Sequence, residues 1–192
     1  MVISVTLDDV RERLARHAPH RLQEPPEPGA MQAAVALILV PTTTGLELLL
    51  IKRAEHPGDP WSGQMALPGG RRDPEDAHLL ATVMRETREE VGVELSPDVL
   101  LGELDDLHPR IRTLPPVVVR PFVFALPRRP EIRTSSEVAL FLWARLEEFA
   151  DRKHRTEVPI PGRGTYPGVM VGGHIVWGMT ERIIRPFIEL LR

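Results

Sequence analysis

Residues 67–93 of this chain read LPGGRRDPEDAHLLATVMRETREEVGV. A pair of glycines stands ahead of an Asp-Pro step, and apolar residues then recur at helical spacing. Asp73 is a favourable helix N-cap, Pro74 suits the first helical position, and Gly92 suits the C-terminal cap. The stretch therefore predicts a helix from Asp73 to Val91 that is entered from a glycine turn.

Three carboxylates crowd one face of this predicted helix. Each residue of an α-helix advances by about 100°, so Glu89 and Glu90 lie about 60° and about 40° to either side of Glu86. Like charges at such spacings destabilise an isolated helix by about a few tenths of a kcal/mol per pair. A charge run of this kind is usually a solvated face, here neutralised by Arg85 and Arg88. The alternative is a site for hard divalent cations, Mg²⁺ or Mn²⁺, which take several oxygen ligands.

The glycines ahead of the predicted helix favour the metal site. Paired glycines at Gly69 and Gly70 allow a tight turn whose backbone carbonyl can face a metal. With this turn at one end and the acids at the other, the stretch resembles the Nudix box, whose pattern is G-x5-E-x7-R-E-U-x-E-E-x-G-U, with U a bulky aliphatic residue. The second half of that pattern is matched by Arg85, Glu86, Glu89, Glu90, Gly92 and Val93.

The chain departs from the pattern in two places. Thr87 occupies the first aliphatic position, and 14 residues separate Gly70 from Arg85 where the pattern has 13. The same one-residue expansion marks Nudix enzymes similar to the coenzyme A pyrophosphatases, which carry G-G-x-x-D-x-x-D after the turn. The corresponding positions here are Gly69, Gly70, Asp73 and Asp76. The chain therefore resembles that branch of the family.

The resemblance covers the chain from about Met31 to the C-terminus. Residues 63–70 read GQMALPGG and look like the G-Q-x-x-F-P-G-G of that branch, with Leu67 in place of Phe. Residues 176–180 read VWGMT and resemble the start of its last helix. The resemblance implies an α/β fold: a Nudix-type α/β/α sandwich with a mixed β-sheet.

The whole chain, residues 1–192, is expected to form one domain. Residues 1–30 are expected to form an N-terminal helix and an extended connector. The helix begins at the N-cap Thr6 and ends near His17. Apolar runs predict strands at residues 33–40, 46–51, 99–107, 117–126 and 137–143. Glycine and proline predict a loop at residues 54–70 and a hairpin with arms at 166–171 and 174–177. Helices are expected at residues 146–150 and 179–191, the latter with a kink or a boundary at Pro186.

The resemblance also implies roles for the acids. Glu86, Glu89 and Glu90, together with the carbonyl of Gly70, are implied to hold Mg²⁺ or Mn²⁺. Arg85 is implied to be an internal salt-bridge partner that orients the Glu side chains. The general base is left open: it is either a Glu of the box or a carboxylate brought in by a loop, for which Glu137 is the candidate. The alternative for Glu137 is a solvated acid at a strand edge.

Substrate contacts are expected from the glycine turn, Gly69 and Gly70, and from the segment before it. Arg53 ends a strand, and its guanidinium suits phosphate oxygens, although an exposed strand end is an equal alternative. Trp61 is either a stacking platform for a base or a buried anchor of its loop. Asp59 stands where a basic residue would suit the 3'-phosphate of coenzyme A, and it is expected to repel that group.

The function predicted from these residues is metal-dependent hydrolysis of a diphosphate linkage in a nucleoside diphosphate derivative. Coenzyme A or its acyl derivatives are the favoured substrates, yielding 3',5'-ADP and a phosphopantetheine. The alternative is a Nudix pyrophosphatase acting on nucleotide sugars, dinucleotides or nucleoside triphosphates. A non-catalytic nucleotide-binding module of Nudix type is disfavoured, because a pure binder does not need three intact carboxylates.

The composition bounds the partners. The formal net charge of −3 gives no global attraction to nucleic acid or to an acidic membrane surface. The absence of cysteine excludes disulfides, thiolate-bound zinc and a cysteine nucleophile. We expect a cytoplasmic enzyme with a small nucleotide-type substrate, no signal peptide and no membrane span. The oligomeric state is open, with a homodimer as one option.

Overall fold

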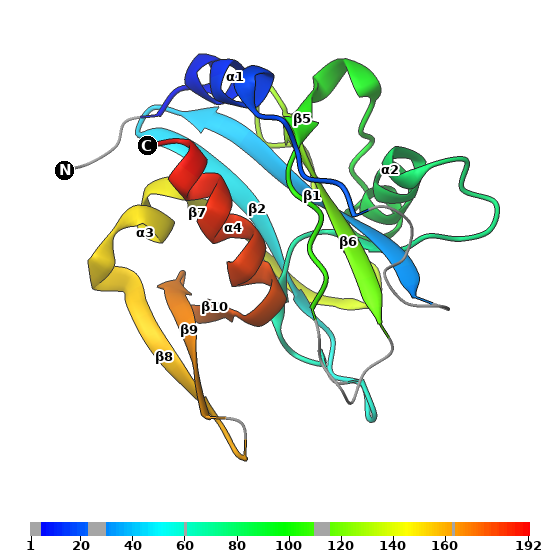
Figure 1. Cartoon of the computed structure of the whole chain (residues 1–192), viewed down its shortest axis with the longest axis vertical. Coiled ribbons are helices and arrows are strands. Elements are labelled where there is room, and N and C mark those ends of the chain that lie inside the picture. The colour runs from blue at the N-terminus through cyan, green and yellow to red at the C-terminus, as the bar shows by residue number, and fades with distance from the viewer. Residues whose placement is uncertain (1–4, 23–29, 60, 110–115, 163) are drawn as a thin grey trace.

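The computed structural model describes residues 5–22, 30–59, 61–109, 116–162 and 164–192. Within them, seven strands form one mixed sheet, in which β3, β2, β1, β6 and β5 are neighbours in that order, β4 pairs with β1, and β7 pairs with β2 (Figure 1). The strands β1 and β6 run parallel, and the other pairs are antiparallel. Their bounds are β1 Met31–Thr42, β2 Gly45–Arg53, β3 Met65–Ala66, β4 Gly69–Arg71, β5 Leu100–Glu103, β6 Val117–Ala125 and β7 Val138–Arg145.

The central strand β1 is buried on both faces. Leu37 and Leu39 point into one apolar cluster, whereas Ala36 and Ile38 point into the other. Successive side chains of a strand face opposite sides of the sheet, so a strand covered on both sides must be apolar at nearly every position. This explains why the sequence shows a continuous apolar run at residues 33–40 and no alternation.

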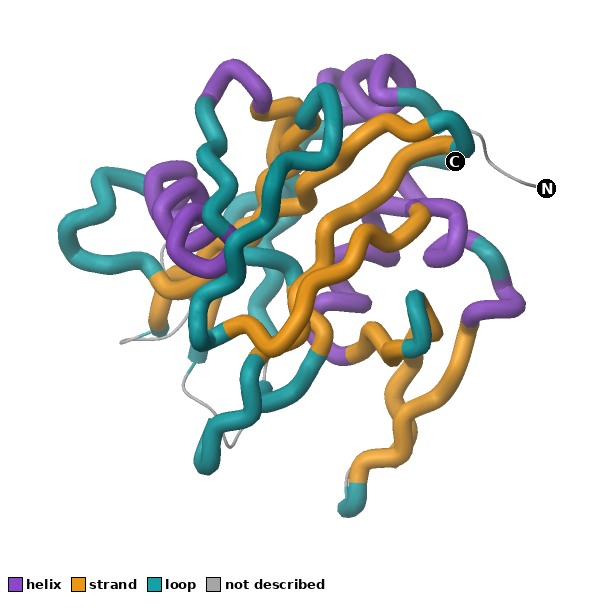
Figure 2. Tube along the Cα trace, turned by 180° about the vertical axis from the view of Figure 1, so that it is seen from behind, coloured by secondary structure: helices purple, strands orange, loops and turns teal. Residues whose placement is uncertain are grey.

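Helices cover both faces of the sheet (Figures 1 and 2). On one face α2, Leu79–Val91, contributes Val83 to the cluster that holds Ile38. On the other face α4, Gly178–Leu190, and α1, Leu7–Arg16, contribute Phe187 and Val10 to the cluster that holds Leu37. The predicted α/β/α sandwich with a mixed sheet is confirmed.

Of the kink or boundary predicted at Pro186, the boundary is wrong, because α4 continues through it. Proline inside a helix removes one backbone hydrogen bond and costs about 3 kcal/mol. Ile184 and Phe187, on either side of it, are fully buried in the core. Burying two such side chains contributes about 3 to 6 kcal/mol, which outweighs the cost of the proline.

A second, three-stranded sheet projects from the domain beside α4 (Figure 1). It consists of β8 Arg155–Ile160, β9 Gly164–Val171 and β10 His174–Trp177, all antiparallel. The predicted hairpin corresponds to β9 and β10, and the short helix before it is α3, Leu146–Ala150. Strand β8 was not predicted, because Pro159 and the turn residues after it suggest a loop and hide the alternation of exposed and partly buried residues along the strand.

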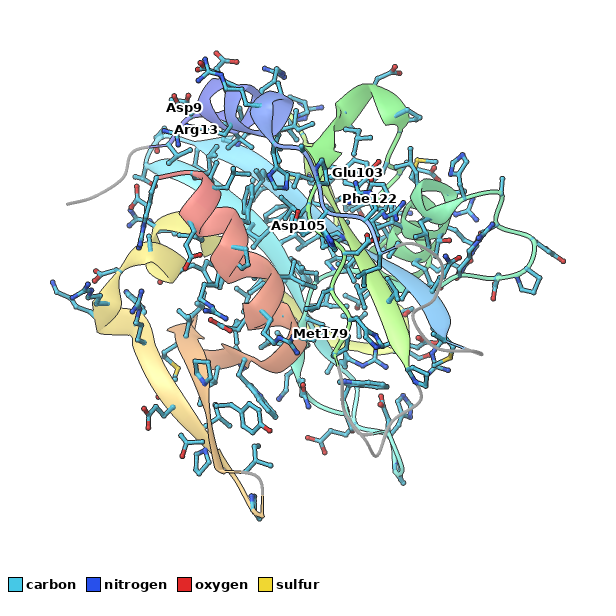
Figure 3. All side chains as sticks on the ribbon, in the orientation of Figure 1. Asp9, Arg13, Glu103, Asp105, Phe122 and Met179 are labelled. Atoms are coloured by element: carbon cyan, nitrogen blue, oxygen red, sulfur yellow. The ribbon has the colours of Figure 1, made fainter. Side chains whose placement is uncertain are left out.

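The N-terminal helix α1 begins as predicted, since Thr6 and Asp9 form a reciprocal capping box. The chain after it is tied to the edge of the sheet beside β5. Nε2 of His17 lies 3.0 Å from Oδ1 of Asp105, and Arg21 pairs with Glu103. Glu103 and Asp105 are labelled in Figure 3. The connector expected at residues 21–29 lies mostly outside the described residues. Within the described chain, none of the helices has the length and apolar character needed to cross a membrane.

Two predictions around the glycine turn are corrected. The segment at residues 54–70 is not all loop, because it contains β3 and the start of β4. Helix α2 begins at Leu79 and not near Asp73, and its N-cap is His78, whose Nδ1 accepts from the backbone N–H of Ala81 at 3.0 Å. The residues between Asp73 and His78 form a turn that is held by its own polar contacts.

Candidate active site

The glycine turn and the acidic face of α2 lie in direct contact. The backbone N–H of Gly69 donates to Oε2 of Glu90 at 2.8 Å. At Gly70 a Cβ would lie 2.4 Å from the carboxylate carbon of Glu86. A side chain at position 70 would therefore displace the Glu86 carboxylate from this position. The pattern of two glycines followed by acids is therefore a packing requirement as well as a chemical one.

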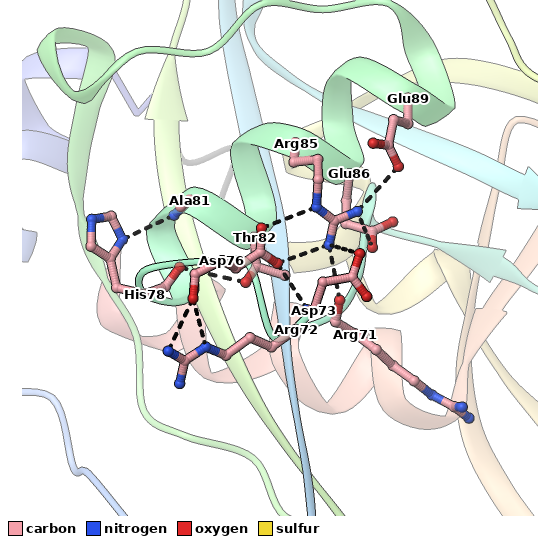
Figure 4. Close-up of polar contacts among 10 residues, drawn as sticks. All are labelled: Arg71, Arg72, Asp73, Asp76, His78, Ala81, Thr82, Arg85, Glu86 and Glu89. Carbon is pink, nitrogen blue, oxygen red and sulfur yellow. Dashed lines mark hydrogen bonds and ion pairs between the residues drawn. The ribbon is translucent and has the colours of Figure 1, made fainter.

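Arg85 donates hydrogen bonds to three acids, Asp76, Glu86 and Glu89 (Figure 4). Its Nε and Nη2 donate to the two oxygens of Asp76 at 3.1 and 2.9 Å, a bidentate pairing. Its Nη1 donates to Oε1 of Glu86 at 2.9 Å and to Oε2 of Glu89 at 3.1 Å. The hydrogen bonds to Asp76 are the largest cause that raises the pKa of Arg85 above its ordinary value. Arg85 thus holds Asp76, Glu86 and Glu89 by hydrogen bonds, and its role in orienting the acids for a metal stays a prediction.

Asp76 is the site residue that the sequence reasoning did not select. It is 7% exposed, and the hydrogen bonds from Arg85 hold its pKa well below the usual range. Its Oδ2 also accepts from the backbone N–H of Asp73 at 3.0 Å, and Arg72 donates to its carbonyl. This network is what stops the helix from starting at Asp73. The signal was the expanded spacing of the box, which places Asp76 in it.

The three box acids differ in burial. Glu90 is 5% exposed, and burial is the main reason that its pKa rises to about 8. Burial also raises the pKa of Glu86. The side chain of Glu89 is 53% exposed. Buried carboxylates without a full counter-charge fit a bound cation, because only a cation removes the cost of ionising them there.

The acids are not gathered in advance around a metal position. Within the described residues, no three His, Asp or Glu side chains form a ready cation site. The physical reason is the hydrogen bonding of Arg85, which draws Glu86 and Glu89 toward its guanidinium. Oxygen donors of this kind suit Mg²⁺ or Mn²⁺, which accept shared and loosely arranged carboxylates.

A pocket of about 600 Å³ opens beside this cluster. It brings together residues that lie far apart in the sequence, and its polar lining includes Arg53, Asp59, Trp61, Glu86, Glu90 and Glu137. Gly69 and Gly70 also line it. Arg85 and Glu89 are not among the described lining residues, so they lie behind or beside the wall. Every predicted substrate contact is therefore in one pocket.

The pocket also has apolar lining residues. Strands β1 and β6, strand β3 and helix α4 provide them, with Met31, Val35, Met65, Val117, Met179 and Ile183 among them. Met179 lies at the end of α4 nearest the centre of the molecule in Figure 3. The sequence reasoning did not predict this part of the pocket lining, because its residues come from four separate elements.

Glu137 and Trp61 reach the pocket from loops. Glu137 stands just before β7, and its carbonyl accepts from the backbone N–H of Ala54 at 2.8 Å, which fixes it beside the end of β2. Its charge is close enough to raise the pKa of Glu90 and Glu86. Trp61 is half-buried, so it contacts both the loop and the pocket.

Comparison with known proteins agrees with this geometry. Residues 30–163 match the family described as the NUDIX domain. The chain belongs to the Nudix family. Its Nudix relatives include the uncharacterized Nudix hydrolase NudL of Yersinia pestis, which is 32% identical over 156 residues, 78% of this chain and 76% of that protein. This chain is therefore a Nudix pyrophosphohydrolase that acts on nucleoside diphosphate derivatives.

A second relative is the uncharacterized protein C14C4.10c of Schizosaccharomyces pombe, 36% identical over 140 residues, or 67% of this chain. The Nudix chain spans 42% of the length of that protein. Among solved structures, a MutT/nudix family protein from Enterococcus faecalis superposes with a TM-score of 0.62 at 17% identity, covering 97% of this chain and 75% of that one. This last likeness shows the fold.

Proposed function

We propose that the chain hydrolyses coenzyme A and its acyl derivatives to 3',5'-ADP and a phosphopantetheine, with Mg²⁺ or Mn²⁺ bound by Glu86, Glu89, Glu90 and the carbonyl of Gly70. The observation that carries the proposal is the pocket, which is lined both by buried carboxylates and by apolar side chains. Coenzyme A has a diphosphate beside a long, mostly uncharged arm. The acids suit a metal-bound diphosphate, and the apolar lining suits the arm.

In this proposal each residue of the site has a separate role. A divalent ion, when bound, neutralises charge on the diphosphate and makes a water molecule more acidic. Arg85 keeps Glu86 and Glu89 oriented through hydrogen bonds. Glu137 lies on the pocket wall close to Glu90, where a carboxylate can accept the proton of an attacking water. Either Glu137 or a box Glu serves as the general base.

Trp61 and the apolar lining bind the parts of the substrate that do not react. Trp61 offers a ring to a base, while Met65 and Met179 adapt to an uncharged chain because thioethers are flexible and polarisable. The second candidate substrates are nucleotide sugars, dinucleotides and nucleoside triphosphates, which share the diphosphate and the base. Among these second candidates, the apolar lining of the pocket favours substrates whose second moiety is uncharged.

The test is a substrate panel with Mg²⁺ or Mn²⁺: coenzyme A, acetyl-coenzyme A, ADP-ribose, NADH and diadenosine polyphosphates, with products resolved by chromatography. We expect coenzyme A and acetyl-coenzyme A to give the highest kcat/KM and 3',5'-ADP as a common product. Faster cleavage of ADP-ribose or a dinucleotide would move the assignment to the second group of substrates. Glu90→Gln serves as the inactive control.

A further inference from the structure

Arg53, at the end of β2, is bound by a carboxylate from the loop that follows it. Its Nη2 donates to Oδ2 of Asp59 at 2.9 Å. Its Nε is buried and has no hydrogen-bond partner among the residues that the structure describes. A guanidinium has five N–H donors, so the pairing cancels the charge of Arg53 without using all of its donors. Asp59, which is expected from the sequence to repel the 3'-phosphate of coenzyme A, is thus paired with Arg53.

The loop holds Asp59 in this position. The other oxygen, Oδ1, accepts from the backbone N–H of Trp61 at 3.0 Å. The backbone N–H of Ser62 donates to the carbonyl of Asp59, and Oγ of Ser62 accepts from the backbone of His56 at 2.8 Å. Burial, the largest effect, raises the pKa of Asp59, yet the hydrogen bonds from Trp61 and Arg53 together leave it below the ordinary value. Asp59 is therefore ionised at neutral pH.

The pair stands in the wall of the substrate pocket. Arg53 and Asp59 both line it, and the positive charge of Arg53 lowers the pKa of Glu90, so the guanidinium lies near the acids. Among the described lining residues, the cationic side chains are Arg53 and Arg71. With Arg53 neutralised by Asp59, this part of the wall offers little net positive charge to a phosphate group.

We propose that Asp59 is a specificity-determining residue, which keeps Arg53 from favouring substrates with phosphate groups beyond the diphosphate. The inference rests on the proposed function and refines its substrate class to diphosphate diesters whose binding depends little on an extra phosphomonoester. Such a group adds about 1.5 to 2 negative charges at neutral pH. An unpaired guanidinium attracts that charge strongly, whereas a neutral Arg–Asp pair does not.

Coenzyme A and dephospho-coenzyme A differ only in the 3'-phosphate, and they therefore isolate the effect. We expect the wild-type kcat/KM for the two substrates to agree within about threefold, and Asp59→Asn to raise the preference for coenzyme A about tenfold through KM. Asparagine keeps an oxygen for the N–H of Trp61 and removes the charge and the oxygen that accepts from Arg53. Glu55→Gln is the matched control, since Glu55 is an exposed acid of the same loop and should leave the ratio unchanged.

A binding measurement separates this inference from the proposed function. Calorimetric titration with AMP and with 3',5'-ADP, in the presence of Mg²⁺, compares ligands with and without the 3'-phosphate and needs no turnover. We expect Asp59→Asn to tighten 3',5'-ADP about tenfold relative to AMP. Adding Arg53→Gln to that variant should remove the gain, because the effect acts through the guanidinium.

The possible outcomes differ for the two ideas. If neither form of coenzyme A is hydrolysed, the proposed function fails, and the binding measurement still decides on Asp59. Equal changes for AMP and 3',5'-ADP, no binding of either ligand, or a strong wild-type preference for 3',5'-ADP would each overturn the role of Asp59. A gain that persists without Arg53 would overturn it as well.

Discussion

At the scale of single residues, Glu89 and Glu90 are neighbours in sequence that occupy different environments. Glu90 is buried and accepts a hydrogen bond from the backbone of Gly69. Glu89 is half in solvent and is bound by Arg85. Successive positions on a helix point about 100° apart, so the carboxylate of Glu89 lies at the rim of the site when that of Glu90 lies inside it.

We expect Glu89→Gln and Glu90→Gln each to reduce kcat by roughly a hundredfold, because a lost ligand for transition-state charge costs about 3 kcal/mol. Neither substitution should lower the melting temperature, since each removes repulsion among the acids. The measurement is kcat at saturating Mg²⁺ together with thermal melting. Near-normal turnover in both variants would contradict the assignment of these acids to a metal site.

The buried acid also predicts a pH dependence of stability without metal. Burial raises the pKa of Glu90 from 4.5 to about 8, so the unfolded chain releases this proton before the folded chain does. Its contribution to the free energy of unfolding is thus complete below about pH 4.5, falls as the pH rises to about 8, and then levels off. The pKa of Glu86 is raised in the same direction.

In EDTA, the melting temperature of the wild-type protein should therefore fall between pH 5 and pH 9 relative to Glu90→Gln, by about 2 to 4 °C for each kcal/mol. Glutamine does not titrate, which makes it the matched reference. Saturating Mg²⁺ should remove most of the difference, because a bound cation favours the ionised carboxylate. Parallel melting curves for the two proteins across this range would contradict the raised pKa.

At the scale of elements, the contact between the β4 turn and its neighbours depends on backbone approach. Gly69 has φ of 143°, and a Cβ there would lie 2.2 Å from the carbonyl oxygen of Ala34 in β1. Both the backbone conformation and the available space exclude a side chain. The same residue supplies the N–H that binds Glu90, so strand pairing and acid placement rest on one position.

Gly69→Ala should destabilise the protein by about 3 kcal/mol or more, as a backbone clash adds to the strain of positive φ. Gly58→Ala is the control: its φ is 85°, and no atom of the described residues lies within 4 Å of an added Cβ. It should cost only about 1 to 2 kcal/mol. Chemical denaturation measures both values. Equal losses in the two variants would show that the clash is absent.

At the scale of the whole molecule, one sheet separates two apolar clusters, and the pocket is built from both sides. Helix α2 and the β4 turn bring the acids, while α4 brings Met179 and Ile183. Helix α1 covers the same face as α4, but its described residues do not line the pocket. The stability of the fold and the chemistry of the site can therefore be changed separately.

Leu14→Ala tests that separation. Leu14 is 6% exposed in the core and packs over Gly102 of β5. Its truncation should lower the free energy of unfolding by about 2 to 5 kcal/mol and leave kcat/KM unchanged at 25 °C. Arg11→Ala, on the solvent side of the same helix, should change stability by about 0.5 kcal/mol or less. A large loss of kcat/KM in Leu14→Ala, with the protein still folded, would link α1 to the site.

The sequence alone determined the elements whose signals are local. The period of the apolar residues gave the helices that follow Thr6 and end at Val91, and continuous apolar runs gave the central strands. The shared face of the box acids also followed from the sequence, because neighbouring turns of one helix fix their relative positions whatever the rest of the chain does. Their role as metal ligands, and that of Arg85 in orienting them, stay predictions.

Tertiary structure decided what depends on distant partners. Asp76 lies in a turn and not in the first turn of a helix, because its carboxylate binds Arg85, nine residues further along the chain. Pro186 stays inside α4 because the core behind it is fully buried. Asp59 is a partner of Arg53 and not a free anion. Each outcome depends on desolvation and charge pairing between segments that only the folded chain brings together, and propensity along the sequence cannot contain that information.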